Sequence, residues 1–239
     1  VLATTRETLS DYREKQYRAG NIVVCVSGAF AEDNIKNLIE DYFSFDEEDY
    51  TRDFKAFSES TTETVRFIQK ATEQAHLVLG VPACSSSDKN KYTSKLLATI
   101  LGGNMSSRMF MKIREEKSLC YYVATASEHY LDTGFVATRA GVDIRRIEDA
   151  VAAIRDEYLL AAREGFSEKE LQKAKDYVRG KTVLRLEDSE SLANLLARQE
   201  LLYNELLSPE ELLSKYDEVK LSDVNELAHK LFSQDMKLA

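Results

Sequence analysis

Apolar and polar positions follow one another with two different periods along this chain of 239 residues. In the longer stretches, apolar residues recur every three or four positions, which is the period of an amphipathic helix. Helix-capping residues precede several of these stretches, for example Ser167 with Glu170 and Ser208 before Pro209. The pattern predicts helices at 5–17, at 32–43, from Ser87 or Asp88 to the glycines at 102 and 103, at 106–116, at 144–165, at 167–207 with a break near Asp188 or Ser189, from Ser208 onward, and at 222–232.

Shorter apolar runs predict the strands. The run 21–27 is apolar on both faces, so we expect it to lie inside a sheet. Runs 63–70 and 76–82 are predicted to pair antiparallel, and 121–130 is predicted to form a second hairpin with 134–142. This order of hairpins and helices predicts an α+β fold, in which an antiparallel or mixed sheet has helices packed on one face.

Residues 44–62 interrupt the pattern, because charged and hydroxyl side chains follow one another there without periodicity. We interpret most of this segment as a linker. The chain is then predicted to comprise a helix–strand–helix unit at 1–45, a linker at 46–62 and an α+β domain at 63–239.

Composition narrows the class of protein. The chain is 44% hydrophobic and 31% charged, which is typical of a globular protein with one core, or one core and an appendage. A formal net charge of −9 argues against non-specific binding to nucleic acid or to an anionic membrane surface. Since no apolar run reaches roughly 18 residues, no membrane span is predicted either.

Three cysteines, Cys25, Cys84 and Cys120, are widely spaced and lie in apolar runs. This pattern indicates buried thiols in a reducing compartment rather than a disulfide framework, and therefore a cytoplasmic protein. The residues before the first helix are too few for a signal peptide. Because the chain begins with Val1 rather than methionine, we expect a fragment or a processed chain.

Common kinds of catalytic site find little support in the sequence. The histidines His76, His129 and His229 are far apart and share no metal-binding spacing, so no zinc site is predicted in this chain. No histidine can be placed beside Cys84, Cys120 or the serines at 85–87 from the sequence alone, and these serines are interpreted as a loop and a cap.

The segment 101–123 carries the strongest candidate site. Gly102 and Gly103 lack the context of a phosphate-binding loop and are predicted to end one helix, and Asn104 or Ser106 can cap the next. That second helix brings Arg114 to its C-terminal end, and Tyr121 opens the following strand. A guanidinium and a phenol, both hydrogen-bond donors, are therefore predicted to converge. Taken alone, a surface ion pair of Arg114 with Glu115 or Glu116 and a packed tyrosine would be the commoner arrangement.

The same segment resembles the second-half signature of the M16 metallopeptidases, the group of pitrilysin, insulysin and the mitochondrial processing peptidases. The matching residues are Gly102 and Gly103, the run 106–110, the run 113–115 and Tyr121. The resemblance implies a LuxS/MPP-like metallohydrolase fold, with residues 1–45 as the tail of a preceding domain. The zinc signature of the family, His-x-x-Glu-His, is absent. The chain therefore resembles the non-zinc half, with no cofactor of its own and with zinc in a complementary half.

The resemblance also implies roles for two residues. In the family, the residues that match Arg114 and Tyr121 bind the backbone of a peptide substrate, and the tyrosine stabilises the oxyanion during hydrolysis. The implied partners are a peptide and a zinc-bearing M16 domain, in cis or in trans. Two alternatives stay open: a catalytically inactive structural or partner subunit, and a free-standing peptide-binding module. Ser118 stands where many members have glycine.

The two ends of the chain look like copies of one unit, a helix followed four residues later by a strand, at 8–24 and at 223–239. If the first copy closes a preceding domain, its strand at 21–27 has exposed edges when that domain is missing. We therefore expect this strand to join the sheet of 63–239, or that of a second copy in a strand-exchanged homodimer.

Overall fold

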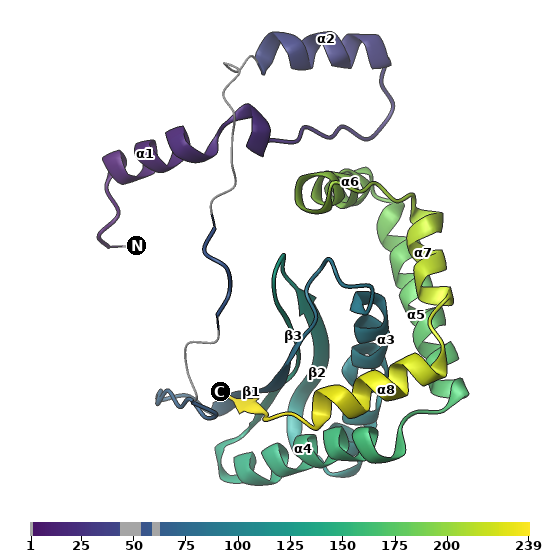
Figure 1. Ribbon diagram of the computed structural model, residues 1–239. Coiled ribbons are helices and arrows are strands. Elements are labelled where there is room, and N and C mark those ends of the chain that lie inside the picture. Colours follow the sequence, from purple (N-terminus) through teal and green to yellow (C-terminus); the bar gives the residue numbers. More distant parts are fainter. Residues whose placement is uncertain (1, 44–53, 59–62) are drawn as a thin grey trace. The chain divides into compact units, whose positions relative to one another are not determined.

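The computed structural model describes residues 2–43, 54–58 and 63–239 (Figure 1). The chain divides into two compact units. One unit consists of Phe57–Thr182 and Ser208–Ala239, and the other of Val1–Ala56 and Val183–Leu207.

A four-stranded antiparallel sheet forms the centre of the first unit. Its strands are β1 (Gln74–Ala83), β2 (Cys120–His129), β3 (Gly134–Asp143) and β4 (Lys237–Leu238), in the order β2-β3-β1-β4. β1 pairs with β3 along its whole length and with the short β4 on its other side. The prediction of an α+β fold with an antiparallel or mixed sheet is confirmed.

The predicted hairpin of β2 and β3 is also confirmed. In its turn, the backbone N–H of Tyr130 donates to the carbonyl of Thr133 at 2.8 Å.

The hairpin predicted from 63–70 and 76–82 is wrong. Residues 63–70 form only an isolated parallel bridge, in which Val65 pairs with Leu238 of β4. Periodicity shows that a run suits a sheet, but it does not show which strand the run pairs with. In the structure, the C-terminal β4 lies between this run and β1.

Helices cover one face of the sheet. α3 (Lys91–Gly102), α4 (Ile147–Glu164) and α8 (Leu221–Phe232) lie against the strands (Figure 1). α7 (Pro209–Asp217) and most of α5 (Glu168–Leu186) belong to the same unit. Two shorter elements flank β2 and β3, a π-helix at Phe110–Glu116 and a 3₁₀ helix at Ile144–Arg146. The predicted capping box of Ser167 with Glu170 is present. The predicted cap at Ser208 is present too, and the structure shows that it is also a capping box, with Glu211.

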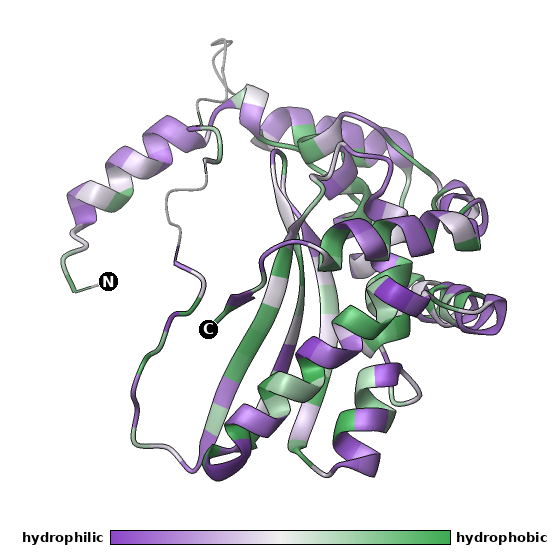
Figure 2. Ribbon diagram, turned by 60° about the horizontal axis from the view of Figure 1, so that its bottom comes forward, coloured by the Kyte–Doolittle hydropathy of each residue, from purple (hydrophilic) through white to green (hydrophobic). Residues whose placement is uncertain are grey.

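The core lies between the helices and the inner face of the sheet. Alternate residues of each strand point into it, because successive side chains of a strand point to opposite faces. Figure 2 shows hydrophobic stretches interrupted by paler and hydrophilic ones along the strands, and hydrophobic and hydrophilic turns mixed along the helices. The fully buried core side chains include Leu96, Leu97, Leu101, Met109, Ile113, Val136, Ala140, Val142, Ile154, Tyr158, Val224 and Phe232.

A series of hydrogen-bonded hydroxyl groups crosses this core. The hydroxyl of Tyr158 lies 2.6 Å from that of Thr138, which lies 2.7 Å from that of Thr125, and Tyr158 also donates to the carbonyl of Leu79 at 3.2 Å. Burial raises the pKa of Tyr158 above its ordinary value. Its ring stacks on Phe232 with 4.3 Å between centroids, so α4, α8 and the sheet meet at this residue.

The second unit contains α1 (Arg6–Gln16), a 3₁₀ turn (Ala19–Asn21), α2 (Glu32–Tyr42) and α6 (Ser189–Tyr203). The break predicted near Asp188 is confirmed, because Asp188 caps α6 by accepting a bond from the N–H of Ser191 at 2.8 Å. Neither α1 nor α2 buries a single residue. Leu9 and Tyr12 of α1 and Leu38 and Tyr42 of α2 are exposed, whereas Ile35 and Ile39 are half-buried.

The predicted strand at 21–27 is wrong, as is its pairing with the sheet of this chain. Within the described ranges, residues 22–27 form no ladder with any strand. The sheet position beside β4 is taken by the segment around Val65, since Arg66 donates to the carbonyl of Leu238 and Leu238 donates to that of Thr64, both at 2.8 Å. The second copy of the helix–strand unit does form its strand as β4. The strand-exchanged homodimer stays a prediction.

The linker predicted at 46–62 lies largely outside the described residues, and the domain boundaries at 45 and 62 stay predictions. All three cysteines are unpaired, but each is half-buried rather than buried as predicted. Among the described helices, none is both long and apolar enough to cross a bilayer.

Candidate functional site

Tyr121 occupies an irregular position at the start of β2. Cys120 pairs with Val142 of β3 and Tyr122 with Gly141, so Tyr121 has no partner of its own and forms a β-bulge. Bulges occur next to active sites, where they redirect a side chain. The side chain of Tyr121 is 60% exposed. Its hydroxyl is therefore available to solvent or to a ligand, although the residue belongs to a strand.

Arg114 lies on the other side of the same turn, in the π-helix Phe110–Glu116. Short π-helical segments are rare and often mark functional sites. The guanidinium of Arg114 lies over the ring of Phe110, 4.7 Å from its centroid, and 3.9 Å from the carboxylate of Glu115. With 43% of the side chain exposed, this weak surface ion pair leaves Arg114 open to a further partner.

The turn between the two residues has a left-handed backbone at Ser118, with φ of 49°. This conformation favours glycine and costs other residues roughly 1 kcal/mol. Ser118 adopts this conformation although it carries a side chain. It is fixed by two backbone bonds to the π-helix, from Lys117 to the carbonyl of Lys112 at 3.2 Å and from Leu119 to that of Ile113 at 2.9 Å.

The two candidate residues flank one turn, and each has a different charged or polar neighbour. Burial raises the pKa of the Cys120 thiol, and the nearby charge of Arg114 opposes this effect. Tyr121 lies near Arg145, whose pKa is raised mainly by its bonds to Asp143 and slightly by Tyr121. The described side chains show no direct bond between Arg114 and Tyr121.

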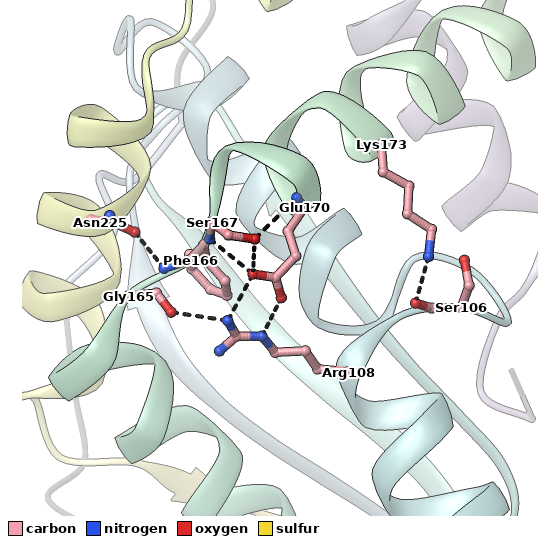
Figure 3. Close-up of polar contacts among 8 residues, drawn as sticks. All are labelled: Ser106, Arg108, Gly165, Phe166, Ser167, Glu170, Lys173 and Asn225. Carbon is pink, nitrogen blue, oxygen red and sulfur yellow. Dashed lines mark hydrogen bonds and ion pairs between the residues drawn. The ribbon is translucent and has the colours of Figure 1, made fainter.

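A second basic residue of the signature, Arg108, has a structural role (Figure 3). Its Nε donates to Oε1 of Glu170 at 2.6 Å, and its Nη2 donates to Oε2 of Glu170 and to the carbonyl of Gly165, both at 3.0 Å. The guanidinium also lies over the ring of Phe166, 4.5 Å from its centroid. Bidentate pairing of this kind is strong and geometrically specific. Arg108 therefore fastens the segment before the π-helix to the start of α5.

The glycines of the signature also have a packing role. α3 ends at Gly102, as predicted, but neither Gly102 nor Gly103 has the positive φ of a glycine C-cap. A Cβ atom on Gly102 would overlap the backbone N and the side chain of Thr125 on β2. Gly102 is therefore required for the close approach of α3 to the sheet rather than for ending the helix.

No set of side chains fits a zinc ion in the described part of the chain. The three histidines have unrelated partners: His76 lies 3.1 Å from the hydroxyl of Tyr122, His129 bonds the carbonyl of Cys84 at 2.8 Å, and His229 lies 3.2 Å from the hydroxyl of Ser233. Since zinc needs three or four ligands at one point, these residues do not suit it.

The alternative nucleophiles also lack an activated arrangement. Sγ of Cys84 lies 3.6 Å from Nδ1 of His129, but burial and the charge of Asp88 raise the pKa of the thiol. A reactive cysteine needs a lowered pKa. Ser85 and Ser87 bond each other at 2.9 Å in a loop, as interpreted from the sequence. The predicted cap at Ser87 or Asp88 is wrong, because α3 begins only at Lys91 with Asn90 in the N-cap position, and Asp88 accepts a bond from the N–H of Asn90 before the helix.

The site, the sheet and the covering helices define a class of protein. Residues 3–178 match the family model described as the peptidase M16 inactive domain. The chain belongs to this family, and the recognition from the segment 101–123 is confirmed.

Curated relatives of similar sequence are named as zinc proteases. The chain is 29% identical over 233 residues to the uncharacterized zinc protease YmxG of Bacillus subtilis, covering 98% of this chain and 56% of that protein. It is 31% identical over 239 residues to the uncharacterized zinc protease ML0855 of Mycobacterium leprae, covering 98% and 54%. The chain thus spans about half the length of these relatives.

Solved structures agree on the fold. A peptidase M16 inactive domain from Pseudomonas fluorescens superposes with a TM-score of 0.87 at 18% identity, over 99% of this chain and 57% of that one. A protease from Helicobacter pylori superposes with a TM-score of 0.84 at 17% identity, over 99% and 58%.

Sequence reasoning missed the residues that surround the site turn. Arg146 donates to the carbonyls of Ser118 and Lys117, and Arg145 lies near Tyr121. Both arginines follow β3, far from the signature in sequence, and no spacing connected them to it. Only the pairing of β3 with β2 brings them to the turn.

Proposed function

We propose that this chain is the non-zinc half of an M16 zinc metalloendopeptidase, in which Arg114 and Tyr121 bind a peptide substrate and assist its hydrolysis. Zinc and the attacking water would come from a zinc-bearing half, in the same polypeptide or in a separate one. Membership of the family, and relatives about twice as long that are named zinc proteases, support the proposal. The unpaired thiols fit the cytoplasmic location predicted from the sequence.

One observation carries the proposal: the signature tyrosine projects from a β-bulge, across a left-handed turn from an arginine on a π-helix. Local backbone irregularities persist where the surrounding structure holds them, and they cluster at functional sites. Three of them within the segment 110–121 favour a functional reason over a packing one.

The chemistry of the pair suits a peptide carbonyl. A phenol and a guanidinium are donors, and their bonds to a carbonyl oxygen strengthen as negative charge develops on it. Tyr121 would hold this oxygen in the transition state, and Arg114 would also hold the peptide in the ground state. Neither residue would move a proton to the leaving group in this scheme.

The test uses the full-length natural protein that contains this chain, assayed on an unstructured peptide. Tyr121→Phe should lower kcat by about 10²-fold with little change in KM, because the lost donor acts mainly in the transition state. Arg114→Ala should raise KM as well. Tyr130→Phe is the matched control, since Tyr130 is also an exposed tyrosine, at the other end of the β2–β3 hairpin. Full activity in both site variants would leave the pair with a structural role only.

The second candidate function is a catalytically inactive partner subunit of the same fold. It is favoured by the contacts of Arg114 with Phe110 and Glu115, which need no substrate. In that case neither variant changes the activity of the assembly, whereas removal of the chain does. A free-standing peptide-binding module would instead bind the peptide without any zinc-bearing half.

A further inference from the structure

Arg146 reaches the turn between Arg114 and Tyr121 from outside the signature. Its Nη1 donates to the carbonyl of Ser118 at 3.1 Å, and its Nη2 donates to the carbonyl of Lys117 at 3.4 Å. Among the described residues, the guanidinium also lies near the carboxylate of Asp149, 3.9 Å from Nε. One planar group thus binds two successive carbonyl oxygens of the turn.

These carbonyls follow directly on the end of the π-helix at Glu116. The last carbonyls of a helix have no partner within it, and positive charge near them is stabilising. Lysine and arginine near a helix C-terminus commonly satisfy such carbonyls. Here the cation is Arg146, which lies 28 positions after Ser118 in the sequence. It therefore connects the turn to the 3₁₀ helix Ile144–Arg146.

The backbone of Arg146 is held by the elements on either side of it. The residue ends the 3₁₀ helix Ile144–Arg146 and stands directly before α4, whose inner side is buried in the core. Asp143 caps this 3₁₀ helix by accepting a bond from the N–H of Arg145 at 2.9 Å, and bonds from Arg145 lower the pKa of Asp143 to about 2. The carboxylate of Asp143 is therefore ionised at neutral pH.

We infer that Arg146 is a positioning residue for the Arg114 and Tyr121 pair. It holds the left-handed turn at Ser118, and this turn sets the direction of the π-helix on one side and of the β-bulge on the other. The inference rests on the proposed function, because it assigns Arg146 to the same site. Small displacements of groups that bind a substrate lower catalytic rates strongly, so a residue that fixes the turn should act on kcat through the pair.

The first measurement does not depend on activity. Amide hydrogen exchange of Lys117 and Leu119, whose N–H groups bond the π-helix, should be roughly 10-fold faster in Arg146→Ala than in the natural protein. Arg155→Ala is the control, because Arg155 is an exposed arginine of α4 whose ion pair is with its neighbour Asp156. Unchanged exchange at both amides would overturn the inference.

The second measurement is a double-mutant cycle in the full-length protein. Arg146→Ala should lower kcat by about 10-fold, Arg146→Lys should lower it less, and Arg146→Ala should have little further effect in a Tyr121→Phe background. An equal loss in both backgrounds would indicate a general structural role and overturn the inference. A normal kcat in Tyr121→Phe, together with faster exchange in Arg146→Ala, would instead refute the proposed function and leave the turn-holding contact intact.

Discussion

The guanidinium of Arg108 binds both carboxylate oxygens of Glu170, at 2.6 Å from Nε to Oε1 and 3.0 Å from Nη2 to Oε2. Six residues later, Arg114 has only a distant carboxylate neighbour, with 3.9 Å between the charged atoms. The two arginines of the signature segment therefore differ in kind. Arg108 connects two parts of the domain, whereas Arg114 is more exposed and has a weaker ion pair.

Replacing Arg108 should lower stability. We expect Arg108→Met to reduce the free energy of unfolding by about 2 kcal/mol, because the part-buried carboxylate of Glu170 loses charge-assisted bonds. Arg163→Met is the control: its pair with the adjacent Glu164 is highly exposed, so its loss should cost less than about 0.5 kcal/mol. Urea denaturation of the variants measures both values, and equal effects would contradict the distinction.

The stability contribution of Glu170 should depend on pH. Burial by itself would raise the pKa of Glu170, but the bonds from Arg108 and Ser167 outweigh it, and the pKa lies below its ordinary value. A carboxyl whose pKa is lowered on folding contributes stability above its unfolded pKa and loses it as the pH falls through its folded pKa.

The natural protein should therefore exceed Glu170→Gln in unfolding free energy at pH 7, and the difference should shrink below about pH 4. Denaturation curves of both proteins across this range are the measurement. A difference that stays constant to low pH would mean that the ionised carboxylate does not provide the stabilisation.

Gly102 should not tolerate a methyl group. Gly102→Ala places a Cβ against the backbone of Thr125, and overpacking of this kind costs about 1–3 kcal/mol. The same change at Gly180, where a Cβ would meet nothing within 4 Å, should instead raise the free energy of unfolding by up to about 1 kcal/mol, because alanine favours the helix. Thermal unfolding of the pair distinguishes close approach from a general intolerance of alanine.

The chain on its own should bind no stoichiometric zinc and cleave no peptide. The three histidines lie in separate places with other partners, and no three ligands of the described residues converge. Metal analysis of the dialysed chain is the measurement. One tightly held zinc per chain that is lost in a His129→Ala variant would contradict the assignment to the non-zinc half.

The sequence determined the local elements and the family. Helix caps such as Ser167 with Glu170, and the hairpin of β2 with β3, depend on residues close together in the chain, so their patterns predicted them. The pattern of residues from Gly102 to Tyr121 was enough to recognise the M16 family. It also predicted that Arg114 and Tyr121 flank one turn.

The tertiary structure decided everything that depends on distant neighbours. Residues 63–70 were given the wrong partner and 21–27 a strand that does not form, because an apolar run is equally suited to any sheet that has room beside it. The pairing of Arg108 with Glu170 and the reach of Arg146 to Ser118 depend on how helices cross the sheet. Side-chain chemistry gives these residues their donors, but only packing decides which arginine is engaged with the protein and which stays largely exposed.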